Sequence, residues 1–262
     1  RQGHLMCTPE QLEDEFRKCL ELAIFMLKTL GLYEDVSYRF SQWDPNDRAK
    51  YIGTEEQWNE AQGLMERILN HLEIPYEIGI GEAAFYGPKL DIQIKNVYGK
   101  EDTLITIQID QMLAEQFGMV YTDKDGKQKT PCIIHRTSIG CYERTLALLI
   151  EKYAGAFPLW LAPVQVKLLP IADRHLDYLY EVKKQLEDKG FRCEVDDRSE
   201  KIGYKIREAQ LEKVPYMVVV GDKDIENSTI SVRKRKEGDL GAMTVEQFLE
   251  KIVPDRDNKV ID

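Results

Sequence analysis

The stretch GEAAFYGPKLDIQIKN (residues 81–96) decides the fold of the first half of this chain. A Gly-Pro turn leads into a segment in which apolar and polar residues alternate, and this alternation predicts a strand. We expect the strand to run from Tyr86 to Ile94. Its apolar face carries Leu90, Ile92 and Ile94, and its polar face carries Lys89, Asp91 and Gln93.

A second alternating strand is predicted at TLITIQI (residues 103–109), directly after the first. Thr106, Gln108 and Asp110 share its polar side. Two adjacent polar strand faces can form the base of a pocket, although a solvent-exposed sheet face is the more common interpretation.

The remaining elements of the first half follow from periodicity and punctuation. Thr54 and Gln57 form a capping box that opens a helix. The Asp-Gly pair in YTDKDGKQKTP predicts a hairpin turn. Leu146, Leu149, Ile150 and Tyr153 are expected to form one apolar face of a helix. The predicted helices span residues 9–31, 55–72 and 141–154, and further strands span residues 36–41 and 132–137.

Beyond GAFPLWLAPVQ (residues 155–165) the rhythm changes to alternating strands and helices. This order predicts a mostly parallel sheet covered by helices. The predicted fold class is therefore α/β (α+β): a mainly antiparallel domain at residues 1–157, then a small α/β domain at residues 158–262.

Composition narrows the function classes. The net charge of −10 argues against diffuse, charge-driven binding of nucleic acid, but leaves room for a local basic face. Five scattered cysteines without a CxxC pair predict reduced thiols in a cytoplasmic protein. No apolar run is long enough for a membrane span. The first residue, Arg1, is not Met, which suggests a cut or an internal start.

A few residues are candidates for chemistry. His4 and His135 could bind a metal through their imidazoles, but a satisfied core or edge histidine is the more common role. Arg144 falls in the first turn of a predicted helix, where a cation is unfavourable unless an anion is near. Either the carboxylate of Glu143 or a bound phosphate would provide that anion. Alternation along STISVRKR places Arg233 and Arg235 on one strand face, suited to contacts with bases or phosphates, or only to solvent.

Four long strings resemble the threonyl-tRNA synthetase family of class II aminoacyl-tRNA synthetases. They are GEAAFYGPKLDIQI, TIQID, IIHRTSIGCYERTLALLIEKYAGAFPLWLAPVQV and DDRSEKIGYKIREAQLEKVPYMVVVGDKD. The resemblance extends in order from His4 to the C-terminus. It implies the C-terminal portion of a class II catalytic domain with motif 3, followed by an anticodon-binding domain.

The resemblance also implies roles for individual residues. His4 and His135 match two zinc ligands, and Arg144 matches the motif 3 arginine that packs on ATP. The positions matching the active-site pocket are Tyr86, Lys89, Gln108 and Cys141, with Lys89 and Arg144 in the catalytic set. The positions matching anticodon contacts are Arg233, Lys213, Asp224 and Ser199.

The implied activity is that of a threonine–tRNA ligase. ATP with Mg²⁺ activates L-threonine to the adenylate, and threonine then passes to tRNA(Thr). One Zn²⁺ per subunit distinguishes threonine from valine, which lacks the hydroxyl group. The family also implies a cytoplasmic homodimer.

The chain departs from the family at several points. Motif 1, most of motif 2 and the string carrying the third zinc ligand, a cysteine, are missing, and Cys7 is not that cysteine. Arg1-Gln2 replaces an acidic pair, and Asp102-Thr103 replaces Trp-Gln. We therefore expect that the chain alone does not activate threonine. A non-catalytic RNA-binding or regulatory paralogue and a prolyl enzyme remain alternatives.

Overall fold

The computed structural model describes residues 2–261, and these form two compact units that divide after Leu148. The sequence left open whether Arg1 is a remnant of motif 2 or a junction between separate stretches of sequence, and Arg1 lies outside the described residues. The predicted domain boundary after residue 157 falls between α4 (Tyr142–Tyr153) and β9 (Val166–Pro170), and it stays a prediction. None of the helices in residues 2–261 combines the length and apolar character needed to cross a bilayer.

The first unit is built on a six-stranded sheet with the order β1-β8-β5-β4-β2-β3. All neighbouring strands are antiparallel except β2 and β3, which confirms the predicted antiparallel class. The strands are β1 (Gln2–Cys7), β2 (Val36–Gln42), β3 (Tyr76–Ile80), β4 (Lys89–Lys95), β5 (Glu101–Asp110) and β8 (Cys132–Thr137). The β6 (Tyr121–Thr122) and β7 (Gln128–Lys129) strands form the predicted hairpin, with Gly126 at φ +77° in its turn.

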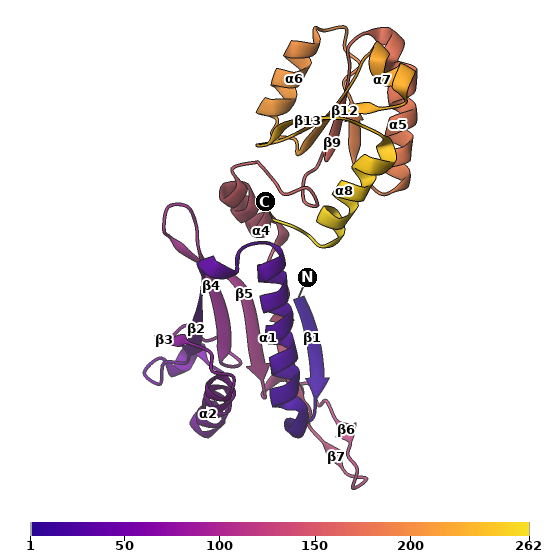
Figure 1. Ribbon diagram of the computed structural model, residues 1–262. Helices are drawn as coiled ribbons and strands as arrows, with labels where there is room; N and C mark the ends of the chain where they lie inside the picture. Colours follow the sequence, from indigo (N-terminus) through magenta and orange to yellow (C-terminus); the bar gives the residue numbers. More distant parts are fainter. Residues whose placement is uncertain (1, 262) are drawn as a thin grey trace. The chain divides into compact units, whose positions relative to one another are not determined.

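Two long helices cover this sheet, as Figure 1 shows for α1. The α1 helix (Leu12–Thr29) contacts β5 and β8, and α2 (Glu55–His71) contacts β5. A short helix, α3 (Leu113–Gln116), follows β5. Thr54 accepts the backbone N–H of Gln57 at 3.3 Å, which confirms the predicted capping box. The apolar strand residues Leu90, Ile92 and Ile94 are at most 1% exposed, as the alternation predicted.

The predicted solvation of the opposite sheet face is wrong. Asp91 is 1% exposed, and Gln93 and Gln108 are each 4% exposed. These side chains are buried because they bond to one another and to backbone groups, which offsets the cost of removing them from water. The polar face is therefore an internal network.

Two local features of this unit differ from the sequence expectations. Tyr86 lies in the turn before β4, because the strand begins only at Lys89 after the Gly-Pro pair. On α4, Leu149 is buried, but Leu146 and Ile150 are 54% and 49% exposed. The buried side of α4 instead includes Thr145 and Leu148, so helical spacing alone did not identify the packed face.

The second unit has a five-stranded sheet with the order β10-β9-β11-β12-β13. The β9, β10, β11 and β13 strands run in one direction and β12 in the other, so the predicted mostly parallel sheet is confirmed. The further strands are β10 (Cys193–Val195), β11 (Tyr216–Val220), β12 (Ile230–Lys234) and β13 (Gly238–Met243). The helices are α5 (Leu176–Asp188), α6 (Ile202–Leu211), α7 (Asp222–Asn227) and α8 (Val245–Asp257). The sequence predictions did not include β1, β13, α3 or α7.

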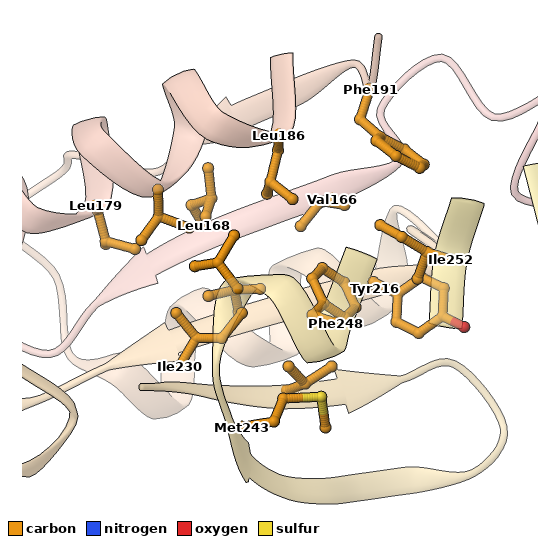
Figure 2. Packing of buried hydrophobic residues seen from close by; sticks show 14 of the residues in the cluster. Val166, Leu168, Leu179, Leu186, Phe191, Tyr216, Ile230, Met243, Phe248 and Ile252 are labelled. Carbon is orange, nitrogen blue, oxygen red and sulfur yellow. The ribbon is translucent and has the colours of Figure 1, made fainter. Parts of the chain in front are cut away.

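The core of the second unit lies between the sheet and the helices α5 and α8. Figure 2 shows Leu179 and Leu186 of α5 near Val166 and Leu168, with Phe248 and Ile252 of α8 near Tyr216. The rings of Tyr216 and Phe248 meet edge to face, with centroids 5.3 Å apart. Burial of each such side chain contributes about 1.5–3 kcal/mol, so this small unit has a core of its own.

Candidate functional site

Four predicted site residues form a single row across four strands of the first sheet. His4 on β1 lies opposite His135 on β8, which lies opposite Gln108 on β5, which lies opposite Lys89 on β4. Directly opposite residues of antiparallel strands project from the same face, with Cβ atoms about 4.5–5.5 Å apart. The register therefore brings together side chains from distant parts of the chain.

The two histidines are the closest of these neighbours. Their ring centroids are 4.7 Å apart, and the rings are nearly perpendicular. The structure thus brings the two predicted metal ligands together. Within residues 2–261, however, no third His, Cys, Asp or Glu completes a group that could hold a metal ion.

His135 has one bonded and one unbonded ring nitrogen. Its Nε2 lies 2.9 Å from Oδ2 of Asp110, a carboxylate that is fully buried. Its Nδ1 is buried and has no hydrogen-bond partner among the described residues. Two imidazoles with a buried, unsatisfied nitrogen fit a metal that takes nitrogen ligands.

The turn before β4 brings Tyr86 into this site. The Tyr86 ring lies 5.1 Å from that of His135, centroid to centroid. Burial, with a smaller contribution from the charge of Asp110, raises the pKa of the Tyr86 hydroxyl. Gln108 Nε2 donates to the carbonyl oxygen of Gly87 at 3.1 Å, which ties the turn to β5. Tyr86 therefore lines the site from a turn.

Lys89 is held by the second buried carboxylate of the polar face. Its Nζ forms an ion pair with Asp91. Asp91 also accepts hydrogen bonds from Ser41 Oγ at 2.7 Å and from Thr106 Oγ1 at 2.6 Å. The sequence placed Asp91 and Asp110 on the polar face but assigned neither a function. Their spacing of two residues from Lys89 and Gln108 was the available signal.

Arg144 and Cys141 lie apart from this row. Both are exposed, at the start of α4. The Arg144 guanidinium donates to the carbonyl oxygen of Thr103, which is five residues before Gln108 on β5, roughly 16–17 Å along the strand. This carbonyl provides a neutral partner for the cation, and the described residues give Arg144 no carboxylate within ion-pair distance.

The four predicted anticodon positions do not gather at one point. Asp224 lies just beyond the carboxyl end of β11, and exposed Ser199 follows the parallel strand β10. Lys213 precedes the amino end of β11 and donates to the carbonyl oxygen of Ala154. Arg233 pairs in register with Met217 near that same end.

Asp224 is 8% exposed and is occupied by local bonds. Its Oδ2 accepts the backbone N–H of Gly221 and its Oδ1 accepts the hydroxyl of Ser231, each at 2.9 Å. These bonds hold the start of α7 against β12. A structural role therefore accounts for Asp224.

Arg233 on β12 has one long side-chain contact among the described residues. Its Nη1 lies 3.5 Å from Asp239, and its Nε is buried without a hydrogen-bond partner in the described residues. Arg235, predicted to share a strand face with Arg233, lies just beyond the end of β12 at Lys234. Arg235 instead donates to the carbonyl oxygens of Lys213 and Phe157, at 2.6 and 2.8 Å.

Two family descriptions match the chain. "tRNA synthetase class II core domain (G, H, P, S and T)" matches residues 1–153, and "Anticodon binding domain" matches residues 165–254.

The chain is also similar to named proteins. It is 60% identical over 251 residues to a threonine–tRNA ligase of Clostridium perfringens and 61% identical over 251 residues to one of Clostridium botulinum. Both alignments cover 96% of this chain but 39% of the relative. Among solved structures, the RNA binding domain of threonyl-tRNA synthetase from Cryptosporidium parvum Iowa II has a TM-score of 0.87 at 32% identity. That alignment covers 96% of this chain and 62% of the solved one.

Proposed function

Because the chain belongs to the class II aminoacyl-tRNA synthetases, and within them to the threonyl-tRNA synthetase family, we propose that it contributes to a threonine–tRNA ligase. It would supply part of the threonine and ATP site and the surface that reads the tRNA anticodon. The chain spans 39% of the length of these curated relatives, so the activity of a whole enzyme is part of the proposal.

The row His4–His135–Gln108–Lys89 carries this proposal. It places two metal-binding imidazoles, a carboxamide and an ammonium group along one sheet face. A threonine presents a carboxylate, an amino group and a hydroxyl group. Lys89 can bind the carboxylate, and Gln108 can bind the amino acid beside the histidines.

His4 and His135 would hold the Zn²⁺ ion, and a ligand from outside these 262 residues would complete its coordination. Such an ion would supply a positive centre that accepts the amino and hydroxyl groups of threonine. Valine has no hydroxyl group, so it would leave that position unsatisfied.

The remaining residues of the site position groups and provide charge. Activation requires the threonine carboxylate to lie in line with the α-phosphate of ATP with its Mg²⁺, which is a matter of orientation and charge. Tyr86 lines the site from the turn before β4. Arg144 would leave the carbonyl oxygen of Thr103 to pack on ATP, and Cys141 would line the substrate pocket.

The second unit would bind the anticodon of tRNA(Thr) through Arg233 and Lys213, with Ser199 at the far end of the sheet. The partly exposed guanidinium of Arg233 supports this role, because a phosphate or base edge could replace Asp239, which lies 3.5 Å from Nη1. Asp224 would act indirectly, by holding α7 in place. A cytoplasmic homodimer is also proposed, and light scattering after size-exclusion chromatography tests the dimer.

Isothermal titration of the zinc-loaded chain tests the proposed site. Threonine should bind at least tenfold more tightly than valine, since the discrimination depends on the hydroxyl group. His135→Ala should remove both zinc binding and this preference. Equal affinity for threonine and valine in a zinc-loaded protein would instead favour a non-catalytic RNA-binding paralogue. ATP–pyrophosphate exchange checks the separate expectation that this chain alone does not activate threonine.

A further inference from the structure

Asp110 is a fully buried carboxylate that bonds in two directions. Its Oδ1 accepts the backbone N–H groups of Met112 and Leu113, both at 2.9 Å. Its Oδ2 lies 2.9 Å from Nε2 of His135. The two backbone donors hold the carboxylate in position, because they come from consecutive residues at the start of α3.

This arrangement decides which nitrogen of His135 carries hydrogen. Oδ1 of Asp110 already accepts two backbone N–H groups, and with Oδ2 also an acceptor the hydrogen of this bond lies on Nε2 of His135. In the neutral ring, Nδ1 then has a free lone pair. That Nδ1 is buried and has no partner among the described residues, a condition that is unfavourable unless something occupies the position.

We propose that Asp110 is a positioning residue that sets the tautomer of His135, so that Nδ1 rather than Nε2 is presented to a ligand beside His4. With the zinc of the proposed function as that ligand, the arrangement is carboxylate, histidine and metal in sequence. Such outer carboxylates orient the ring and strengthen the ligand. The metal part of this inference rests on the proposed function, whereas the tautomer part does not.

The variant Asp110→Asn gives a sharp test. The carbonyl oxygen of the amide should remain on the backbone N–H groups of Met112 and Leu113, since these require an acceptor. The amide NH₂ group then faces Nε2 of His135 and can only donate to it. The tautomer of His135 should therefore invert, with hydrogen on Nδ1 and the lone pair on Nε2.

Nitrogen-15 NMR of the histidine rings shows directly which ring nitrogen carries hydrogen. In the unaltered chain, His135 should have hydrogen on Nε2, and adding zinc should shift the Nδ1 resonance. In Asp110→Asn the assignment should reverse, and zinc affinity should fall roughly 10- to 100-fold. Asp91→Asn is the matched control, because Asp91 is also a buried carboxylate of this face but does not bond to His135. It should leave the His135 tautomer unchanged.

The possible results distinguish the role of Asp110 in setting the His135 tautomer from the presence of a zinc site. Hydrogen on Nδ1 in the unaltered chain, or zinc bound through Nε2, would overturn the role of Asp110, and neither measurement depends on the variant folding. The same tautomer in the unaltered chain and in a folded Asp110→Asn variant would also overturn it. Absence of zinc binding together with an inverted tautomer would overturn the zinc site and leave the role of Asp110 supported.

Discussion

His4 and His135 lie directly opposite each other on adjacent antiparallel strands, with ring centroids 4.7 Å apart, although almost half the chain separates them in sequence. His4 is on the strand that begins the described residues, and His135 is on the strand before α4. The two histidines, with Asp110 bonded to His135, form the centre of the proposed site.

Replacing either histidine should weaken zinc binding. His4→Ala and His135→Ala each remove one imidazole ligand, so zinc affinity measured by chelator competition should fall by roughly tenfold or more. His71→Ala is the control, because His71 is exposed and its ion-pair partner is Glu13 on α1, away from this row. An equal loss in all three variants would point to nonspecific surface binding.

Arg233→Ala should weaken binding of tRNA(Thr) by about 1–3 kcal/mol, since it removes a guanidinium that is 31% exposed and makes a 3.5 Å contact with Asp239. Filter binding at fixed salt measures this. Arg207→Ala removes an equal charge from an exposed position on α6 and should have a much smaller effect. Zinc affinity should not change in either variant, and an equal effect of both on tRNA would deny Arg233 a specific role.

Gly87→Ala should destabilise the first unit. An added Cβ would lie 2.3 Å from the carbonyl oxygen of Ile109, which is backbone and cannot move aside. Overpacking of this kind costs about 1–3 kcal/mol. Gly63→Ala, in the interior of α2 and without close contacts, should instead stabilise by about 0.5–1 kcal/mol. Urea denaturation followed by tryptophan fluorescence compares the two.

Asp224→Ala should destabilise the second unit by about 1–2 kcal/mol, because it removes the acceptor for Gly221 N–H and for the Ser231 hydroxyl group. Glu226→Ala, on the exposed side of the same short helix, is the control and should have little effect. Thermal unfolding measures both. Unchanged stability together with lost tRNA binding would return Asp224 to a direct contact role.

The thiols should differ strongly in reactivity. Cys141 is exposed and should react quickly with a disulfide reagent at neutral pH. Burial, followed by the charges of neighbouring groups, raises the pKa of the Cys7 thiol to about 11, so it should stay protonated and unreactive.

The same shift in Cys7 makes stability depend on pH. The unfolded chain releases the thiol proton at a lower pH than the folded chain does. This contribution to stability is therefore present at neutral pH and is lost as pH rises from about 9 to about 11. Cys7→Ser should reduce the alkaline slope of the free energy of unfolding. An unchanged slope, or rapid labelling of Cys7 at neutral pH, would contradict the assignment.

Local pattern in the sequence was enough to predict most elements and the fold class. Alternation identified β4 and β5, the Thr54–Gln57 capping box fixed the start of α2, and the Asp-Gly pair fixed the hairpin. These features depend on residues within one turn or one strand, so they are readable without knowing the partners. The candidate site residues were assigned from the resemblance to the threonyl-tRNA synthetase family.

The tertiary structure alone decided the register that aligns His4, His135, Gln108 and Lys89, and the partners of each buried polar group. Strand pairing joins residues that are distant in the chain, and a shift of one position would send each side chain to the other face. For the same reason, the sequence could not show that Asp110 holds His135. Nor could it show that Arg235 donates to backbone carbonyl oxygens, whereas Arg233 lies beside the carboxylate of Asp239. Periodicity determines which face a residue occupies, whereas contact across strands determines what that residue can bind.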